Sequence, residues 1–372
     1  MEPGEEDQTG FPERHECVSD TNEQNAGTTG VREGFAFDEA ALAAWMQQNV
    51  DGYKGPLTVE QFKGGQSNPT FKLETPDRSY VMRRKPPGKV LKGAHAVDRE
   101  ARVQSALAKA GFPVAHIYGL CTDDSVIGSM FYIMEAVDGR IIWDVLSPQF
   151  SPEERGALYD AMNATIAQLH TVDYETIGLG DYGRPGNYFA RQVGRWSRQY
   201  FDDVEAGHDP NMDRLIDWLQ EHMPDDETTT IIHGDYRIDN MVFHPTEPRV
   251  LAVLDWELST LGHPGADFGY LGMIYRLPEH ILFGLAGKDL KALGIPSEEE
   301  YVASYCKRTG RESLPDYDYY MAFNFFRLAA IYHGIKGRYI RGNAASAKAK
   351  NRVEVLPELM ALAWHQAEIA RI

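Results

Sequence analysis

The stretch 231–256 constrains this chain more than any other part of its sequence. Two apolar runs rich in β-branched residues, 228–232 and 249–254, have the length and composition of buried strands. Each run ends in polar residues, and side chains at the ends of buried strands are held rigidly enough for catalysis. Three such residues are therefore the candidate functional groups: Asp235, Asn240 and Asp255.

The chemistry that these residues would support is phosphoryl transfer. Transfer from ATP needs a carboxylate to orient the attacking hydroxyl and accept its proton, and oxygen ligands for magnesium. The spacing Asp235-x-x-x-x-Asn240 matches the kinase catalytic loop H-R-D-x-x-x-x-N, with Gly234 replacing the arginine. Asp235 is the predicted base, and Asn240 and Asp255 are the predicted Mg²⁺ ligands. One motif alone would equally fit a turn after a strand, because Gly, Asp and Asn favour turns.

The sequence resembles the aminoglycoside phosphotransferase and choline kinase superfamily in two segments, His233-Gly-Asp-Tyr-Arg-Ile-Asp-Asn240 and Leu254-Asp255-Trp256. Segments 80–88 and 256–264 are similar to a narrower group, related to the kinase domain fused to some acyl-CoA dehydrogenases. The resemblance runs from about Phe35 to the C-terminus. It implies an α+β, two-lobed, protein-kinase-like fold: a small antiparallel sheet in the N-terminal lobe, a mostly helical C-terminal lobe, and ATP with Mg²⁺ between them.

The resemblance also implies supporting roles for two residues near the catalytic loop. His233 has the chemistry of a general base, but its position in the superfamily orders the loop. Asp267-Phe-Gly269 spells the magnesium motif of protein kinases, yet it begins 32 residues after Asp235, whereas Asp255 lies 20 residues after it and ends a strand. The later aspartate usually braces the loop, so Asp267 is expected to be structural.

A phosphate-binding loop is predicted between the first two of three strands, at 57–63, 69–75 and 79–85. Its glycines, Gly65 among them, permit close backbone approach to a phosphate, and Ser67 and Asn68 offer donors. A simple hairpin could also use two glycines, so the loop gains weight only from the cationic strand that follows.

That cationic strand carries Arg83 at the position where kinases place a lysine to grip the α- and β-phosphates. Lys85 is the alternative, since it lies two residues on and on the same strand face. Glu100, in a helix predicted from about 94 to 110, is the expected partner of the cation. A surface ion pair of little energetic value is the other interpretation.

The chain is divided by prediction into three parts. Residues 1–34 hold nine acidic and two basic side chains and little to bury, so they are expected to be a disordered acidic tail. Residues 35–138 form the nucleotide-binding lobe, in which the backbone of Glu135 to Val137 is expected to contact adenine. Residues 139–372 form the lobe with the catalytic loop, the metal and the substrate site.

Composition narrows the partners. The formal net charge is −18, which argues against a nucleic-acid partner. Three scattered cysteines suggest no disulfide framework, and neither a transmembrane run nor a signal pattern is found, so a cytoplasmic location is expected. The oligomeric state is not readable from the sequence.

Two features of the C-terminal half have both a structural and a functional interpretation. The aromatic-rich stretch 316–336 is expected to be a central helix rather than a ligand box. Basic residues between 336 and 352 are either solvated surface or a site for an anionic substrate such as a coenzyme A thioester. A last helix is predicted over 344–371.

The predicted function is ATP- and Mg²⁺-dependent transfer of phosphate to a hydroxyl of a small molecule, with a hydroxyacyl-CoA as one candidate. A nucleotide-binding pseudokinase with a regulatory role is the alternative, although nothing in that role would require Asp235, Asn240 and Asp255 together. A metal-dependent hydrolase is a third hypothesis, but it calls for more clustered carboxylate or histidine ligands than the sequence offers.

Overall fold

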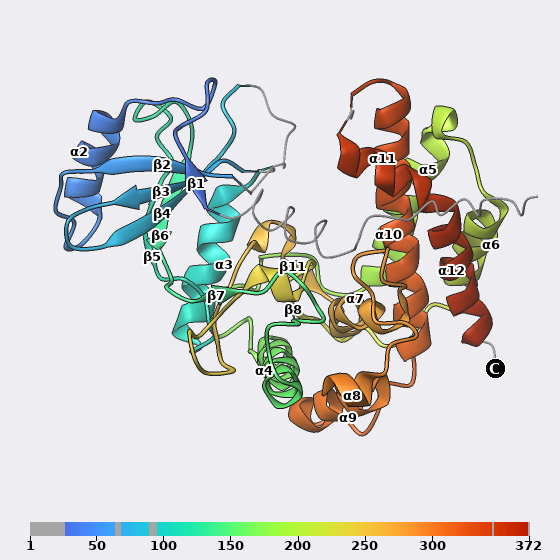
Figure 1. Ribbon diagram of the computed structural model, residues 1–372. Helices are drawn as coiled ribbons and strands as arrows, with labels where there is room; N and C mark the ends of the chain where they lie inside the picture. The colour runs from blue at the N-terminus through green and yellow to red at the C-terminus, as the bar shows by residue number, and fades with distance from the viewer. Residues whose placement is uncertain (1–26, 64–67, 89–94, 344–345, 371–372) are drawn as a thin grey trace, which may run out of the picture. The chain divides into compact units, whose positions relative to one another are not determined.

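The computed structural model describes residues 27–63, 68–88, 95–343 and 346–370 (Figure 1). The chain forms two compact units: one of residues up to Ala101 together with His116–Ala136, the other of Arg102–Ala115 and Val137 onward. The predicted lobe boundary near residue 138 lies close to the point between Ala136 and Val137 where the chain enters the second unit for the last time. The segment Arg102–Ala115 belongs to the second unit because its apolar side chains, such as Leu107, are buried in that unit's core.

Within the described residues, the first unit is built on an antiparallel sheet of six strands in the order β1-β2-β3-β4-β6-β5. Their bounds are β1 Thr28–Thr29, β2 Thr58–Phe62, β3 Thr70–Glu74, β4 Ser79–Arg84, β5 Ile117–Cys121 and β6 Phe131–Glu135. The three predicted strands are confirmed to within one residue. Disorder was the wrong prediction for the end of the tail, because Thr28 and Thr29 pair with Phe62 and Gln61 of β2.

Two helices complete the first unit's framework. Asp38 accepts a hydrogen bond from Ala41 N (2.9 Å) and begins α2 (Glu39–Asn49). This helix buries Leu42 and Met46 against the apolar face of the sheet. Helix α3 (Val97–Lys109) carries Glu100 in its first turn and continues into the second unit.

The second unit contains two small antiparallel strand groups. One has the order β10-β9-β7 and the other pairs β11 with β8. Their bounds are β7 Arg140–Ile141, β8 Thr230–Ile232, β9 Met241–Phe243, β10 Val250–Val253 and β11 Thr260–Gly262, with 3₁₀ turns at η1 Val204–Ala206, η2 Ile238–Asn240 and η3 Trp256–Leu258. Asp235 lies between β8 and η2, Asn240 ends η2, and Asp255 lies between β10 and η3.

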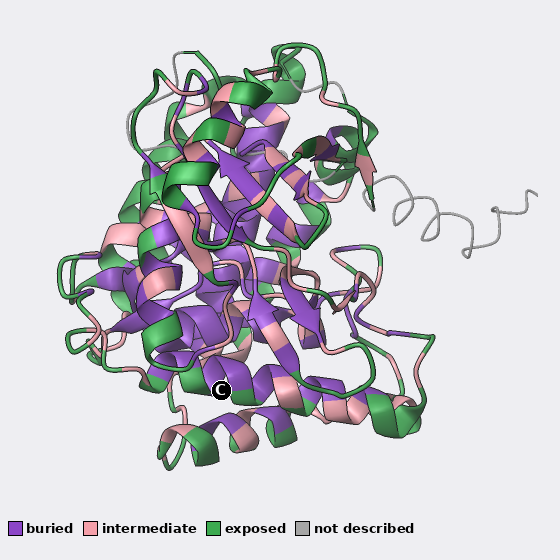
Figure 2. Cartoon of the chain, turned by 90° about the vertical axis from the view of Figure 1, so that its left-hand side faces the viewer, coloured by how far each residue is buried: buried purple, intermediate pink, exposed green. Residues whose placement is uncertain are grey.

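Helices make up most of the second unit, as the predicted α+β class requires (Figure 1). They are α4 Pro152–Thr171, α5 Tyr188–Asp202, α6 Pro210–Glu221, α7 Pro264–Arg276, α8 Leu290–Leu293, α9 Glu298–Thr309, α10 Tyr317–Ile340, α11 Ala347–Glu354 and α12 Leu356–Ile369. The aromatic-rich α10 is buried on nearly all sides and packs on α5, α7 and α12, which confirms its prediction as a central helix. Figure 2 shows that buried residues lie on strands and on the inner faces of helices, whereas exposed residues lie mainly on loops and outer helix faces. No helix among the described residues has both the length and the apolar character needed to cross a membrane.

The single helix predicted over 344–371 is wrong. The chain forms α11 and α12 instead, with a break at Val355. Pro357 lies in the first turn of α12, where its missing N–H is harmless. In a continuous helix the same proline would lose a hydrogen bond and clash with the carbonyl of Val353.

Arg84 is the polar anchor of the first unit's core. It leaves β4 on the face opposite to Arg83 and is only 2% exposed. Its guanidinium donates to Ser129 Oγ (2.7 Å), Ile127 O (2.9 Å) and Phe35 O (3.2 Å). Burial lowers the pKa of Arg84, but a guanidinium stays protonated in proteins. Arg84 therefore ties β4 to two loops.

Replacing Arg84 by methionine should cost about 3 kcal/mol of unfolding free energy, because two buried carbonyls and a hydroxyl lose their donors. Arg78→Met, which removes an exposed arginine at the start of the same hairpin, should change stability by less than about 0.5 kcal/mol. Urea denaturation of both variants checks this, and equal effects would contradict the anchoring role.

Candidate active site

The catalytic loop follows β8 and places Asp235 between donors from two elements. Tyr270 Oη of α7 donates to Asp235 Oδ1 (2.6 Å), and Asn240 Nδ2 donates to Asp235 Oδ2 (3.1 Å). Asn240 Nδ2 also donates to the backbone carbonyl of Asp235 (2.8 Å). The two ends of the predicted D-x-x-x-x-N motif are thus in direct contact.

The pKa of Asp235 lies below its usual value. Burial alone would raise it, but the charge of Arg237 and the hydrogen bonds from Tyr270 and Asn240 outweigh that effect. Arg237 Nε lies 3.5 Å from Asp235 Oδ1, and its Nη2 binds Asp239 (2.8 Å). Asp235 is therefore a carboxylate at neutral pH, the form that can orient a hydroxyl.

Asp255 is brought beside Asn240 by a backbone link between their strands. Leu254 N donates to Asn240 O (2.8 Å), and Asp255 follows in a left-handed conformation (φ 63°). The Asn240 amide nitrogen is used by Asp235, which leaves its oxygen to act as a ligand. Asn240 and Asp255 thus offer the hard oxygen donors that suit Mg²⁺.

Few protein ligands are available for a metal. Among the described residues there is no cluster of three or more His, Cys, Asp or Glu side chains that could hold one. A magnesium ion at Asn240 and Asp255 would thus take most of its ligands from phosphates and water, which is how Mg²⁺ is commonly bound.

His233 links the catalytic loop to the strand that precedes Asp255. Its Nε2 contacts Leu254 O (2.8 Å), and its Nδ1 accepts from Asp235 N (3.2 Å). The ring packs edge-to-face on Trp256, with centroids 4.8 Å apart. Both ring nitrogens are therefore occupied in the neutral form, an arrangement that suits loop ordering rather than proton transfer.

Gly234 explains why the arginine of the kinase motif is absent here. Its φ is +84°, and a Cβ atom at this position would lie 2.9 Å from Leu258 O. A side chain would thus be strained by its backbone and would collide with η3.

Asp267 braces the turn before Asp235 from the first turn of α7. Its Oδ2 accepts from His233 N (2.7 Å) and its Oδ1 from Gly234 N (2.8 Å). Asp267 Oδ2 also lies 3.3 Å from His170 Nε2, and His170 Nδ1 contacts Tyr305 Oη (2.7 Å). His170, in the last turn of α4, is therefore part of this buried network.

Glu100 contacts the polar side chains of Arg83, Tyr132 and Asn68. Arg83 Nε lies 2.8 Å from Glu100 Oε2, Tyr132 Oη donates to the same oxygen (3.1 Å), and Asn68 Nδ2 donates to Oε1 (2.8 Å). Arg83 is 9% exposed and Glu100 1%, so the pair is buried rather than a surface ion pair. Asn68 is fully buried, and its side chain also contacts His95 Nδ1 (2.9 Å), so this side chain holds Glu100 instead of offering a donor to phosphate.

The other residues that are predicted to contact the nucleotide lie in several parts of the chain. Gly65 and Ser67 lie outside the described residues. Lys85 follows the end of β4 and is half-buried, with its backbone N–H bound to Met130 O. Glu135 ends β6, and its N–H donates to His116 O (2.8 Å), so this group is not available to adenine. Val137 begins the longer segment of the second unit.

Sequence reasoning missed three side chains around Asp235: Arg237, Tyr270 and Arg327. Arg327 of α10 donates through Nη2 to Gly234 O (2.7 Å), and its guanidinium lies 5.2 Å from the centroid of the Tyr270 ring. A signal for Tyr270 was present, because it lies three residues after Asp267 and therefore on the same helix face. Arg327 offered no such signal, since only the fold brings α10 to the loop.

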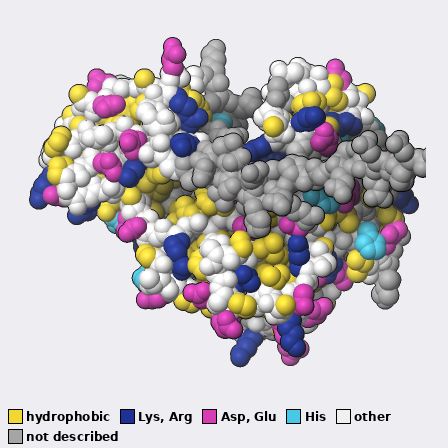
Figure 3. All heavy atoms as spheres, viewed as in Figure 1, with side chains coloured by type: hydrophobic (Ala, Val, Ile, Leu, Met, Phe, Trp, Pro, Cys, Tyr) yellow, Lys and Arg dark blue, Asp and Glu magenta, His cyan; other side chains and the backbone are white. Residues whose placement is uncertain are grey.

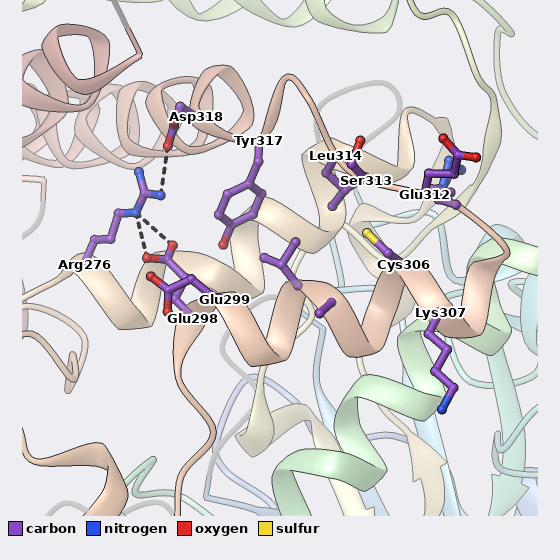
Figure 4. A pocket seen from close by; sticks show the side chains of 13 residues that line it. Arg276, Glu298, Glu299, Cys306, Lys307, Glu312, Ser313, Leu314, Tyr317 and Asp318 are labelled. Atoms are coloured by element: carbon purple, nitrogen blue, oxygen red, sulfur yellow. Dashed lines mark hydrogen bonds and ion pairs between the residues drawn. The ribbon is translucent and has the colours of Figure 1, made fainter. Parts of the chain in front are cut away.

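A cavity of about 570 Å³ lies elsewhere in the second unit, lined mainly by α9 and the segment leading to α10 (Figure 4). Arg276 on its wall binds Glu298 (2.8 Å) and Asp318 (2.9 Å). Acidic and basic side chains lie close together over α8 and α9 (Figure 3). No member of the catalytic set lines this cavity.

The chain is similar to known proteins in sequence and in fold. A model of the phosphotransferase enzyme family matches residues 58–304. The chain is 43% identical over 340 residues to acyl-CoA dehydrogenase family member 10 of Mus musculus. This match covers 91% of this chain and 32% of that protein. The chain spans less than half the length of the curated relatives that it matches.

Two solved structures are similar as well. The structure of a candidate aminoglycoside phosphotransferase from Ralstonia eutropha has a TM-score of 0.84 and 53% identity, covering 90% of this chain and 99% of that chain. An aminoglycoside phosphotransferase mutant in complex with AMP-PNP and hygromycin B shares the fold, with a TM-score of 0.54 and 15% identity over 87% of this chain and 99% of that chain. The predicted superfamily and kinase-like fold are confirmed.

The brace predicts a loss of stability for Asp267→Asn. One carboxylate oxygen would become an NH₂ group facing a backbone N–H, at a cost of about 3 kcal/mol. Asp173→Asn is the matched control, because Asp173 also accepts two backbone N–H bonds but is exposed. Its cost should stay below about 1 kcal/mol.

A pH dependence follows from the same contacts. Burial would raise the pKa of Asp267, but hydrogen bonds and the nearby histidines hold it below its usual value. Its contribution to stability is therefore complete above the unfolded pKa of about 3.9 and is lost as the pH falls further. Wild type should lose stability more steeply below about pH 4 than Asp267→Asn, and parallel pH profiles would contradict this.

Proposed function

Because the chain belongs to the phosphotransferase enzyme family, we propose that it transfers the γ-phosphate of ATP to a hydroxyl group of a small molecule in a magnesium-dependent reaction. The observation that carries this proposal is the arrangement of Asp235, Asn240 and Asp255. Asp235 is held in its ionised form and contacts Asn240, and a backbone link brings Asp255 beside Asn240. Asn240 and Asp255 both offer oxygen ligands. Orientation of a hydroxyl and neutralisation of phosphate charge are the two requirements of phosphoryl transfer.

Each residue then has a defined task. Asp235 orients the attacking hydroxyl and accepts its proton. Asn240 and Asp255 hold Mg²⁺, which when bound neutralises the charge of the phosphates. Arg83 binds the phosphates and is kept in place by Glu100, and Lys85 stays the alternative cation. The buried Arg83–Glu100 contact favours Arg83.

ATP is supported as the donor by the likeness to a phosphotransferase solved with AMP-PNP. That likeness shows a shared fold only, so we infer nucleotide binding mainly from Arg83 and Glu100. Arg83 and Glu100 form a buried pair of a cation and a carboxylate, and Glu100 also contacts Tyr132 and Asn68. This pair has the character of the lysine–glutamate pair in kinases.

The acceptor is proposed to be a small-molecule alcohol, with a hydroxyacyl-CoA as one candidate. The named relatives are acyl-CoA dehydrogenase family members, which favours a coenzyme A thioester over an antibiotic. The basic stretch 336–352 offers less charge than its sequence suggests, because Arg341 pairs with Asp203 and Glu205 and Lys350 with Glu354. Arg352 lies over the ring of Tyr332.

Asp235→Asn tests the proposed reaction. ADP release from MgATP should be measured with aminoglycosides, choline, homoserine and a 4-hydroxyacyl-CoA as acceptors. The substitution keeps the shape of the side chain but removes the proton acceptor, so turnover should fall roughly 10²–10⁴-fold with MgATP affinity retained. Unchanged turnover would exclude Asp235 as the base. MgATP binding by wild type without turnover on any acceptor would favour the pseudokinase.

Asp255→Ala tests the metal site. Removal of this oxygen ligand should weaken ATP binding at least tenfold in the presence of Mg²⁺ and leave the weaker, metal-free binding unchanged. Calorimetric titrations with and without Mg²⁺ would show this. Glu247→Gln, an exposed acidic residue between β9 and β10, is the control. Equal Mg²⁺ dependence in Asp255→Ala and wild type would place the metal elsewhere.

A further inference from the structure

We propose that Tyr270 is a positioning residue, whose hydroxyl fixes the orientation of the Asp235 carboxylate for the incoming acceptor hydroxyl. The inference rests on the proposed function, in which Asp235 is the base, and assigns Tyr270 a role that neither the motif nor its spacing contains. Its basis is the contact between Tyr270 Oη and Asp235 Oδ1, at 2.6 Å. This distance is typical of a hydroxyl bound to a carboxylate, which is stronger than a neutral hydrogen bond.

The two oxygens of Asp235 are held by different parts of the chain. Tyr270 on α7 holds Oδ1, and Asn240 at the end of η2 holds Oδ2. Rotation of the carboxylate would break both contacts at once. A carboxylate oxygen has two acceptor positions, so each oxygen can still accept one more hydrogen bond. The acceptor hydroxyl therefore meets a carboxylate whose plane is already set, which is the condition for an effective base.

Tyr270 is itself held firmly. It lies one turn after Asp267 on α7, so the residue that braces the loop and the residue that holds Asp235 belong to one helix. Arg327 stacks over its ring at 5.2 Å and donates to Gly234 O (2.7 Å), which ties the tyrosine to the residue before Asp235. Burial and then the charge of Asp235 raise the pKa of Tyr270, so its hydroxyl remains a donor.

The alternative is that the Tyr270 hydroxyl only satisfies a buried carboxylate. Asp235 already has Asn240 as a donor and Arg237 nearby, so its charge is compensated without the tyrosine. A purely structural role therefore predicts an effect on stability, whereas a positioning role predicts an effect on the chemical step.

Tyr270→Phe separates these roles, with Tyr275→Phe as the matched control. Tyr275 lies on the same helix, and its buried hydroxyl has no hydrogen-bond partner among the described residues. With the best acceptor of the panel, Tyr270→Phe should lower kcat about tenfold and change the KM for MgATP by less than twofold. Tyr275→Phe should leave both constants unchanged. Wild-type kcat in Tyr270→Phe, or a loss explained by a lower melting temperature, would overturn the proposal.

Crystal structures of both variants make the test independent of turnover. In Tyr270→Phe the Asp235 carboxylate should rotate or take two orientations, and in Tyr275→Phe it should keep its contact with Asn240. An unrotated carboxylate in Tyr270→Phe would overturn the positioning role even if no acceptor is found. Lack of activity in wild type would instead count against the proposed function, so the two failures are distinguishable.

Discussion

The active-site geometry depends on one carboxylate, that of Asp267, which accepts the consecutive backbone N–H groups of His233 and Gly234. These two groups turn the chain sharply after β8, so that Asp235 leaves the strand in a defined direction. The carboxylate is buried, and an unsatisfied donor there would cost roughly 1–3 kcal/mol. The turn and the brace therefore stabilise each other, and Gly234 is the residue that the close approach of Leu258 permits.

Each of the two units holds a buried carboxylate in a similar way. In each, a buried carboxylate receives donors from separate elements: Asp235 from Tyr270 and Asn240, and Glu100 from Tyr132 and Asn68 beside Arg83. Several donors on one carboxylate hold it in its ionised form and fix its orientation. For a phosphotransferase this matters because positioning and electrostatics supply most of the catalysis.

The parts of the fold that the sequence predicted are those with local causes. The three strands predicted between residues 57 and 85 follow from the turn residues that separate them. The motif predicted that Asp235 and Asn240 share one loop, and the structure adds the contact between them. Arg83 was predicted as the cation with Lys85 as the alternative, and the structure pairs Arg83 with Glu100, its expected partner.

The parts that were missed depend on distant segments. The contact of Tyr270 with Asp235 spans 35 residues and that of Arg327 with Gly234 spans 93, so neither is visible until α7 and α10 are packed. Asn68 was predicted to offer a side-chain or a backbone donor to phosphate, and the fold buries its side chain against Glu100. The break at Val355 did have a local cause, Pro357, which the apolar pattern concealed.

In the function that we propose, Asn240 and Asp255 hold the metal and Arg83 binds the phosphates of the nucleotide. A crystal structure with Mg²⁺ and AMP-PNP would test these roles together. We expect Mg²⁺ bound to the side-chain oxygen of Asn240 and the carboxylate of Asp255, with Arg83 in contact with the phosphates. A nucleotide bound away from these residues, or a metal held by other side chains, would contradict these roles.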